Sequence, residues 1–353
     1  MSKILFILKR REDFNASVHN KLGLSTGLFN SASFMNHMLN NLGIESDLKV
    51  AIDNNCIDKL VSDYNPTHVI IEALWVVPQK FVILQKLHPN VIWIIRLHSE
   101  MPFLAGEGSA LDWIGDYSNF KNIIIGINAP RMLHEISVFL KTRNNWSNEQ
   151  VSKKLLYLPN YYPQDYKTKV LDKNKEYIDI SCFGAIRPLK NHILQAFAAI
   201  DFANQIGKKL RFHINAGRVE MKGDAVMNNL YRLFEQISDS NHQLIGHQWR
   251  PREEFLDLCS GMDIGLQVSF SETFNIVSAD LLSQGIPLVT TFSEVPWSIE
   301  KYCANPVDST DIVKKLHITY NEYDLNVLEH QESLSKYTNK TSEIWNNYFK
   351  KEI

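Results

Sequence analysis

Two carboxylates in the C-terminal half of the chain are the side chains best placed to do chemistry. Glu272 and Asp280 are eight positions apart in the segment Ser269–Val289, between two strand-like runs. If a helix begins near Asn275, Asp280 lies on its second turn and Glu272 in the loop before it. Backbone N–H groups at that helix start favour an anion, and the carboxylates accept hydrogen bonds from hydroxyls. The segment predicts half of a site for a phosphate-linked sugar, although a surface Glu and a helix-stabilising Asp give the same pattern.

Two cations follow another strand-like run. Ile178–Phe183 leads into Gly184, and Arg187 and Lys190 lie in the turn after it. Ligands of parallel sheets bind at the carboxyl ends of the strands, where two fixed cations neutralise a departing diphosphate. Asn191 is predicted to cap the next helix. The alternative interpretation is an arginine and a lysine on a solvated loop.

These residues need elements that hold them, and short apolar runs alternate with helical stretches along the whole chain. The runs are Lys3–Leu8, Asp47–Ala51, His68–Ala73, Val91–Leu97 and Asn122–Ile127, then Ile178–Phe183, Leu210–Ala216, Gln243–Gly246, Ile264–Val268 and Leu288–Thr291. Continuous apolar runs are typical of buried parallel strands. The alternation predicts an α/β protein with two doubly wound sheets. We expect domains at 1–165 and 166–333, a C-terminal helix within 334–353, and a linker over Gln164–Glu176.

Composition narrows the class of protein. The chain has 353 residues, a formal net charge of −2 and 44% hydrophobic residues, as a two-domain globular protein would. That charge argues against a broad electrostatic grip on nucleic acid. The cysteines are scattered without paired spacing, which favours reduced thiols and a cytoplasmic location over a zinc site. We find no signal peptide and no apolar run long enough to span a bilayer.

The site segments resemble the E-x7-E signature of the retaining GT-B glycosyltransferases. Family members read like P-S-x-x-E-x-F-G-x-x-x-x-E here, and this chain has Asn275 for the usual Gly and Asp280 for the second Glu. Gly184, Arg187 and Lys190 match the order of the family's G-R-x-x-x-x-K-G element, with the Arg displaced. The resemblance covers nearly the whole chain and is strongest over 178–297. It implies two Rossmann-like domains facing across a cleft, with a C-terminal helix that returns to the first domain.

The resemblance also implies roles for individual residues. It implies transfer from a nucleotide-sugar donor with retention of anomeric configuration and without a metal or other cofactor. Glu272 would hold hydroxyls of the sugar, Arg187 and Lys190 the diphosphate, and His98 the sugar or its reaction centre. The donor-binding residues it implies are Gly27, Gly184, Asn215, Gly217, Trp249, Thr273, Phe274, Asn275, Ile276 and Asp280.

Some of these residues have two interpretations. The segment Gly23–Gly27 either brings backbone N–H groups to a phosphate or is a flexible loop before a helix. His247 or Trp249 either stacks on the base of the nucleotide or, for Trp249, belongs to the core. A lone His98 at a strand end is more often structural, and its position favours function.

The acceptor is predicted from a cluster of basic residues after the first strand. Lys9, Arg10, Arg11 and Lys21 suggest an anionic acceptor, such as lipopolysaccharide or another glycan. The opening residues also resemble glycosyltransferases carried by tailed phages, which makes hydroxymethylated DNA an alternative acceptor, in the host cytoplasm. If the cluster merely ends a strand in solvent, neither follows.

Two other classes share parts of this pattern. A nucleotide-sugar 2-epimerase has the same architecture and needs an acid and a base in the first domain, for which Glu72 and Glu100 are the candidates. A non-catalytic binding module is the other alternative. The joint presence of Arg187, Lys190 and Glu272 favours an enzyme over such a module.

Overall fold

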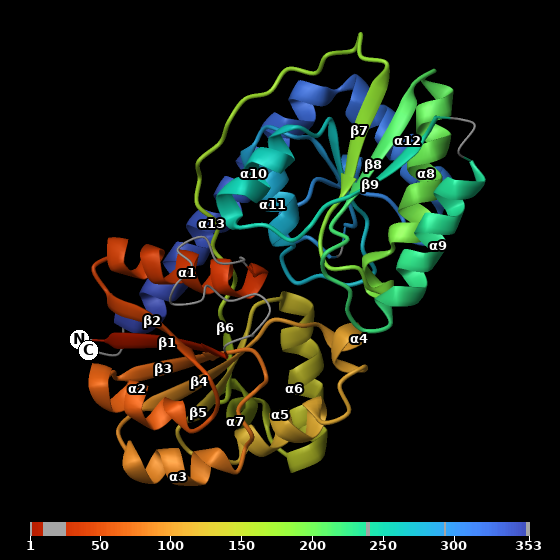
Figure 1. Cartoon of the computed structure of the whole chain (residues 1–353). Helices are drawn as coiled ribbons and strands as arrows, with labels where there is room; N and C mark the ends of the chain where they lie inside the picture. The colour runs from red at the N-terminus through yellow and green to blue at the C-terminus, as the bar shows by residue number, and fades with distance from the viewer. Residues whose placement is uncertain (1, 10–25, 238–240, 293, 351–353) are drawn as a thin grey trace. The chain divides into compact units, whose positions relative to one another are not determined.

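The chain folds into two compact units. The computed structural model describes residues 2–9, 26–237, 241–292 and 294–350. Unit 1 contains Met1–Pro163 together with Thr338–Ile353, and unit 2 contains Gln164–Tyr337. In each unit helices cover both faces of one sheet (Figure 1).

Unit 1 is built on a parallel sheet of six strands in the order β2-β1-β3-β4-β5-β6. The strands are β1 (Lys3–Lys9), β2 (Glu45–Ala51), β3 (His68–Glu72), β4 (Ile92–Leu97), β5 (Ile123–Ile127) and β6 (Leu155–Tyr157). Five of them correspond to the apolar runs expected from the sequence. The sixth, β6, was not predicted, because three half-buried residues carry too little pattern to indicate a strand.

Both faces of this sheet are buried. Ile4 and Phe6 of β1 point into a core that α1 (Gly27–Asn41) covers, whereas Leu5 and Ile7 point into the opposite core, because successive strand residues face opposite sides. The helices of the opposite side are α2 (Cys56–Tyr64), α3 (Lys80–Leu87), α5 (Ala110–Ser118) and α6 (Pro130–Asn144), with the short helices α4 (Met101–Leu104) and α7 (Asn148–Ser152) between elements. Burial on both faces explains why the strands are continuously apolar.

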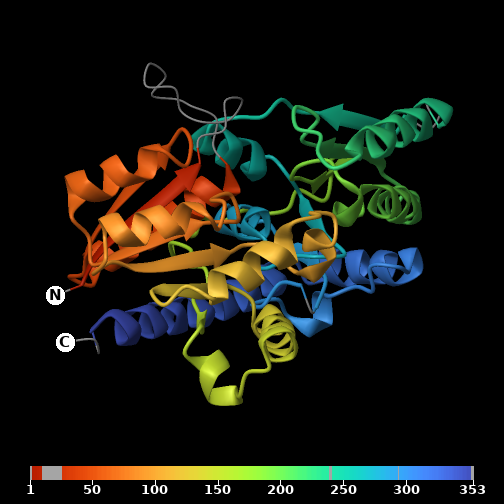
Figure 2. The same ribbon diagram turned by 90° about the horizontal axis from the view of Figure 1, so that it is seen from below.

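The C-terminal helix α13 (Tyr323–Lys350) begins in unit 2 and ends in unit 1. Its fully buried Trp345 lies 6.1 Å from the ring of Phe6 and donates its indole N–H to the Pro159 carbonyl at 3.0 Å. Figures 1 and 2 both show this end of α13 beside the first sheet. The predicted return of the helix to the first domain is confirmed, and the helix begins at Tyr323 rather than at Leu334.

Unit 2 contains a second parallel sheet, of five strands in the order β11-β10-β7-β8-β9. The strands are β7 (Tyr177–Cys182), β8 (Lys209–Ile214), β9 (Gln243–Gly246), β10 (Ile264–Gln267) and β11 (Leu288–Thr290). All five correspond to predicted runs. The two parallel sheets and the long C-terminal helix confirm the predicted α/β fold class.

The helices of unit 2 lie on both faces of its sheet (Figure 1). One face packs against α8 (His192–Gln205), α9 (Gly223–Gln236) and α12 (Ser309–Asn321), and the other is covered by α10 (Arg252–Ser260) and α11 (Ile276–Ser283). Two 3-10 turns, Pro188–Lys190 and Glu300–Tyr302, complete the unit. Among the helices of the described residues, none is long and apolar enough to cross a bilayer.

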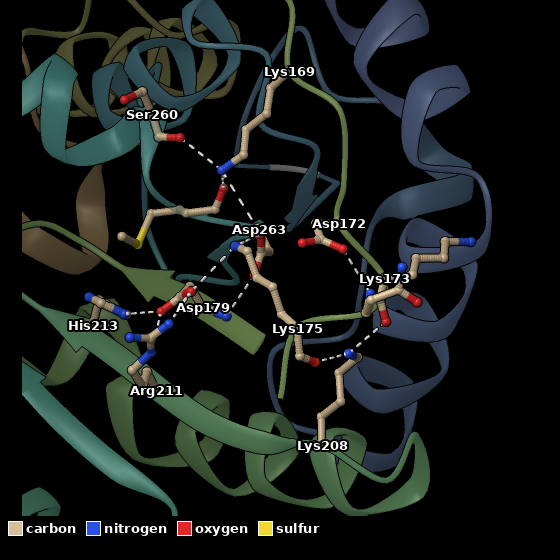
Figure 3. Close-up of polar contacts among 12 residues, drawn as sticks. Lys169, Asp172, Lys173, Lys175, Asp179, Lys208, Arg211, His213, Ser260 and Asp263 are labelled. Atoms are coloured by element: carbon tan, nitrogen blue, oxygen red, sulfur yellow. Dashed lines mark hydrogen bonds and ion pairs between the residues drawn. The ribbon is translucent and has the colours of Figure 1, made fainter. Parts of the chain in front are cut away.

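The linker Gln164–Glu176 has neither helix nor strand and is fastened to unit 2 by lysines (Figure 3). Lys169 donates to the carbonyl of Ser260 at 2.8 Å. Lys175 forms an ion pair with Asp263 at 2.9 Å. Both lysines thus bind the segment between Ser260 and Asp263, which leads from α10 into β10.

Asp179 of β7 connects Asp263, which binds the linker, to the neighbouring strand β8 (Figure 3). Its backbone N–H donates to Asp263 at 3.0 Å, and its carboxylate contacts His213 Nε2 at 3.0 Å. Burial opposes ionisation of Asp179, but His213 and Arg211 outweigh burial and hold its pKa below the usual value. The carboxylate therefore stays ionised and joins the linker to β8.

Buried histidines should make the stability of this protein depend on pH. Burial lowers the pKa of His192 to about 3 and that of His330 to about 4. The unfolded chain binds protons near pH 6.5 and the folded chain does not, so the free energy of unfolding must fall as the pH drops below about 6.5. Each such histidine contributes about 2 kcal/mol of this loss between pH 6.5 and pH 5.

We expect His330→Gln to weaken the pH dependence of the melting temperature between pH 7 and pH 5. His37→Gln, at an exposed position of α1, is the matched control and should keep the wild-type slope. Equal slopes for His330→Gln and the wild type would contradict the assignment.

Candidate functional site

The predicted donor-binding residues of unit 2 lie on loops at one edge of the second sheet. Parallel strands present their carboxyl ends at the same edge. Gly184 and Lys190 follow β7, Gly217 follows β8, Trp249 follows β9 and Glu272 follows β10. The topology therefore brings together residues that are distant in the sequence.

The central contact of this edge is an ion pair between Lys190 and Glu272. The two side chains are only 10% and 9% exposed. The backbone N–H of Glu272 donates to the carboxylate of Glu294 at 2.8 Å, and Glu294 is a buried residue that the sequence did not single out. The pair thus holds a cation and a carboxylate side by side at this edge.

Buried amides tie together the loops that carry this pair. Gln195 is fully buried, accepts the Val268 N–H at 2.7 Å and donates to the Lys190 carbonyl at 2.7 Å. The Asn191 side chain donates to the carbonyls of Val268 at 3.1 Å and Pro306 at 2.8 Å. Asn191 occupies the predicted N-cap position of α8, but its side chain makes no capping hydrogen bond. Its amide is used instead to bind neighbouring loops.

Two glycines allow close approach of the loops. Gly184 has a φ of +119°, and a Cβ there would lie 3.5 Å from Lys190 Cε. Its N–H donates to the Asn215 side chain at 2.8 Å. A Cβ at Gly217 would lie 2.7 Å from the backbone nitrogen of Trp249, which is too close. Glycine is therefore required where the loop after β8 meets the loop after β9.

Trp249 and His247 differ in their surroundings. The guanidinium of Arg218 lies over the ring of Trp249, 4.8 Å from its centre. His247, the other residue expected to stack on a base, instead stacks on His213 with ring centres 5.2 Å apart. Arg218 is a further residue that the sequence did not single out.

Asn275 begins helix α11, as the sequence predicted. It has a φ of 58°, and its side chain accepts the Ser278 N–H at 3.0 Å and donates to Gln267 at 3.2 Å. Asn is one of the few residues other than Gly that adopt this left-handed conformation routinely. Asn275 therefore combines a left-handed backbone with a side-chain cap of α11.

Asp280 lies on the second turn of α11, as expected, and has a charged partner. Its carboxylate accepts from Arg252 Nη1 at 2.7 Å, and its side chain is 4% exposed. Arg252 is the first residue of α10, a helix to which the sequence assigned only a structural role. The shorter carboxylate is thus held in place by an arginine.

The three remaining donor-loop residues surround Asn275. Phe274 is buried, its ring lies 6.0 Å from that of Trp297, and its carbonyl accepts the Trp297 indole N–H at 3.2 Å. Thr273 and Ile276 are half-buried on either side. Phe274 therefore fixes the loop by packing against Trp297, rather than presenting its side chain to a ligand.

In unit 1, His98 joins a buried charged cluster at the carboxyl edge. Glu72 and Arg96 face each other across β3 and β4, are both fully buried, and are joined by bonds of 3.2 Å from Arg96 Nη1 to both carboxylate oxygens. His98 Nε2 contacts the same carboxylate. Burial opposes ionisation of Glu72, but Arg96 outweighs it and lowers its pKa, while burial lowers the pKa of His98. His98 is thus a neutral imidazole on an ionised carboxylate.

The other predicted residues of unit 1 lie around β1 and α1. Gly27 is the first residue of α1, and the Thr26 side chain caps that helix by accepting the Phe29 N–H at 3.2 Å. Lys9 ends β1 and is exposed. The other predicted acceptor residues lie outside the residues that the structure describes: Arg10, Arg11 and Lys21.

Arginine and lysine side chains supply positive charge at the edge of the second sheet. Arg187, Lys190 and Arg218 lie on the loops after β7 and β8. Over the described ranges, no group of three or more His, Cys, Asp or Glu residues is arranged to hold a metal ion.

Comparison with known proteins identifies the fold. No protein-family model matches the chain, and no curated protein sequence matches it. Among solved structures, the sucrose-phosphate synthase of Thermosynechococcus elongatus is similar over 99% of this chain and 98% of that one, with a TM-score of 0.68 and 9% identity. The chain has the GT-B fold.

Two other GT-B structures are similar to it. The UDP-forming α,α-trehalose-phosphate synthase of Burkholderia vietnamiensis matches 99% of this chain and 96% of that one, with a TM-score of 0.67 and 9% identity. A variant of TarM from S. aureus, solved in complex with UDP, matches 84% of this chain and 58% of that one, with a TM-score of 0.58 and 14% identity. At these identities the likeness concerns the fold.

Substitution of Asn275 should separate its conformation from its capping bond. Asn275→Gly keeps the left-handed backbone, so it should lower the free energy of unfolding much less than Asn275→Ala does. Asn275→Ala loses the cap, about 1 kcal/mol, and strains the backbone by about 1–2 kcal/mol. Urea unfolding of both variants measures the difference. An alanine variant as stable as the glycine variant would show that the left-handed conformation is not required.

Proposed function

We propose that this protein is a retaining glycosyltransferase that moves a sugar from a nucleoside-diphosphate sugar to a hydroxyl group. The observation that carries the proposal is the Lys190–Glu272 ion pair at the carboxyl edge of unit 2. Its members occupy the positions where the family motifs have a cation and the first carboxylate. The names of similar structures add support, since one synthase is described as UDP-forming and TarM was solved with UDP.

In this reaction the cations act on the leaving group. The bond between the anomeric carbon and a phosphate oxygen breaks, and its electron pair goes to the departing nucleoside diphosphate. Lys190 and Arg187 neutralise that charge, and each charge-assisted hydrogen bond contributes about 1.5–3 kcal/mol. When the diphosphate binds Lys190, the carboxylate of Glu272 is released to accept hydrogen bonds from the sugar.

The carboxylates hold the donor. Glu272 binds hydroxyls of the transferred sugar, and Asp280, held by Arg252 at 2.7 Å, binds the ribose. The acceptor oxygen attacks the face that the diphosphate leaves, so the configuration is retained. Its proton passes to the leaving phosphate, as the family resemblance implies, and no dedicated base is needed.

We assign to His98 the sugar contact that the resemblance implies. The ionised carboxylate of Glu72 is only an acceptor, so the Nε2 of the neutral imidazole must carry the proton. Nδ1 is then the ring acceptor.

The geometry of unit 1 disfavours the epimerase alternative. Glu72 is 0% exposed and paired with Arg96. Glu100 is 3% exposed and forms an ion pair with Arg131. Neither carboxylate is placed to exchange a proton with a substrate carbon.

Loss of either cation should slow turnover strongly. We expect Lys190→Ala and Arg187→Ala each to lower kcat by about 10²- to 10³-fold, because the leaving charge is no longer neutralised. Lys314→Ala, at an exposed position of α12 in the same unit, is the control. The donor is first found by a thermal-shift screen of nucleotide sugars, and release of nucleoside diphosphate is then measured.

The outcomes of that screen are distinct. Near-normal turnover in both variants would reject the assigned roles. Tight donor binding without hydrolysis or transfer to any acceptor would favour a non-catalytic binding module. No response to any nucleotide sugar by the folded protein would reject the proposed function.

For the acceptor, we propose an anionic molecule, with a glycan as the first choice. The exposed Lys9 at the end of β1 supports this choice, and it begins the basic run Lys9–Arg11. Modified DNA from a phage is the second candidate, because the same cations would bind its phosphates.

Salt dependence of binding distinguishes these acceptors. If DNA is the acceptor, the logarithm of the duplex binding constant should fall steeply with the logarithm of salt concentration, by roughly 0.9 per phosphate contact. Joint replacement of Lys9, Arg10 and Arg11 by Ala should then reduce the slope by roughly 2–3. Replacement of the exposed Lys59, Lys86 and Lys153 is the control. A flat slope for hydroxymethylated duplex would reject the DNA alternative.

A further inference from the structure

The loop after β8 pairs with the loop after β7 at the edge of the second sheet. Ile186 and Val219 form an isolated parallel bridge outside the named strands. The Ile186 N–H donates to the Arg218 carbonyl at 2.9 Å, and the Glu220 N–H donates to the Ile186 carbonyl at 2.9 Å. These backbone bonds place Glu220 beside Arg187 although the two residues are far apart in the sequence.

The Glu220 carboxylate is shared unequally by two arginines. Its Oε1 accepts from Arg218 Nε at 2.7 Å and from Arg218 Nη2 at 2.5 Å. Its Oε2 lies 3.7 Å from Arg187 Nη1, which is an ion pair but longer than a hydrogen bond. Arg218 is therefore hydrogen-bonded to Glu220, whereas the contact between Glu220 and Arg187 is a longer ion pair.

The same contacts reach the loop after β9. Arg218, held by Glu220, lies over the ring of Trp249 at 4.8 Å, and its side chain is only 11% exposed. A continuous chain of contacts thus runs from Arg187 through Glu220 and Arg218 to Trp249. It joins a residue expected to bind the diphosphate to a residue expected near the base.

The side chains joined by these contacts, together with the Lys190–Glu272 pair, carry charges of both signs. Arg187, Arg218 and Lys190 carry three positive charges, and Glu220 and Glu272 carry two negative ones. His192 also faces Arg187 and Lys190, but burial lowers its pKa to about 3, so it is neutral near pH 7. Glu220 therefore lowers the net positive charge that a diphosphate would otherwise meet.

We propose that Glu220 is a positioning residue that holds Arg187 for the diphosphate and weakens the binding of the nucleoside-diphosphate product. The inference rests on the proposed function. While the site is empty, Glu220 supplies the anion that Arg187 needs. When a diphosphate binds, it takes over Arg187, and the negative charge of Glu220 remains close to it. That repulsion favours release of the product.

This role predicts that removal of the Glu220 charge increases the affinity for a nucleoside diphosphate, whereas a substitution that disturbs the structure would decrease it. Glu220→Gln keeps the shape of the side chain and an oxygen that accepts from Arg218, but removes the charge. It should bind the nucleoside diphosphate roughly three- to tenfold more tightly, because one like charge at short range is removed. A residue with a merely structural role would leave the affinity unchanged or weaken it.

Calorimetry with UDP, GDP and ADP, and with inorganic pyrophosphate as a base-free probe, tests the proposal. The gain in affinity should appear with pyrophosphate as well, and kcat should fall if product release limits turnover. Glu220→Asp keeps the charge and should retain the wild-type affinity. Glu235→Gln, an exposed carboxylate on α9, is the control for net charge.

A double variant that keeps the net charge of the site is a second control. Glu220→Gln combined with Arg218→Gln removes one charge of each sign and should return the affinity to the wild-type value. Unchanged or weaker binding by folded Glu220→Gln, with normal binding by the wild type, would overturn this inference and leave the proposed function standing. Failure of the wild type to bind any of the four probes would overturn both.

Discussion

The buried amide of Gln195 couples the two loops on which the candidate site depends. It accepts the N–H of Val268 at 2.7 Å and donates to the carbonyl of Lys190 at 2.7 Å, so it bonds to the loops after β10 and β7 at once. Loss of either bond would leave a buried polar group unpaired, at a cost of about 1–3 kcal/mol. The backbone that carries Lys190 and the backbone that leads to Glu272 are therefore held in one register before any ligand binds.

Arg187 and Lys190, on the loop after β7, each form an ion pair with a carboxylate of the same unit. A half-buried charge is costly without a partner, so the protein must supply one while the site is empty. A nucleotide sugar offers phosphate to the cations and hydroxyl donors to the carboxylates, so it can replace both members of a pair. Under the proposed function this exchange applies to the Lys190–Glu272 pair, whereas in the Arg187–Glu220 pair the diphosphate would replace only the carboxylate.

The strands could be predicted from the sequence because they depend on local pattern. Contacts between residues far apart in the sequence could not. Continuous apolar runs indicated the strands of both sheets except β6, which is too short to show a pattern. Glu220 looks like a surface residue in the sequence, and only the bridge between Ile186 and Val219 brings it to Arg187. The N-cap position of Asn191 follows from the local pattern, but the bonds of its amide to carbonyls on other loops do not.

The departures from the family motif are informative because they satisfy the same physical demands with different residues. A sheet buried on both faces requires only apolar side chains at the right period, so the fold persists at 9% identity with a TM-score of 0.68. The loop before α11 requires a left-handed residue, which Asn275 supplies with a φ of 58°. Asp280 is one methylene shorter than the usual Glu, and Arg252 from α10 holds it at 2.7 Å. Asn275 and Asp280, where this chain departs from the motif it resembles, are thus each held by a contact of their own.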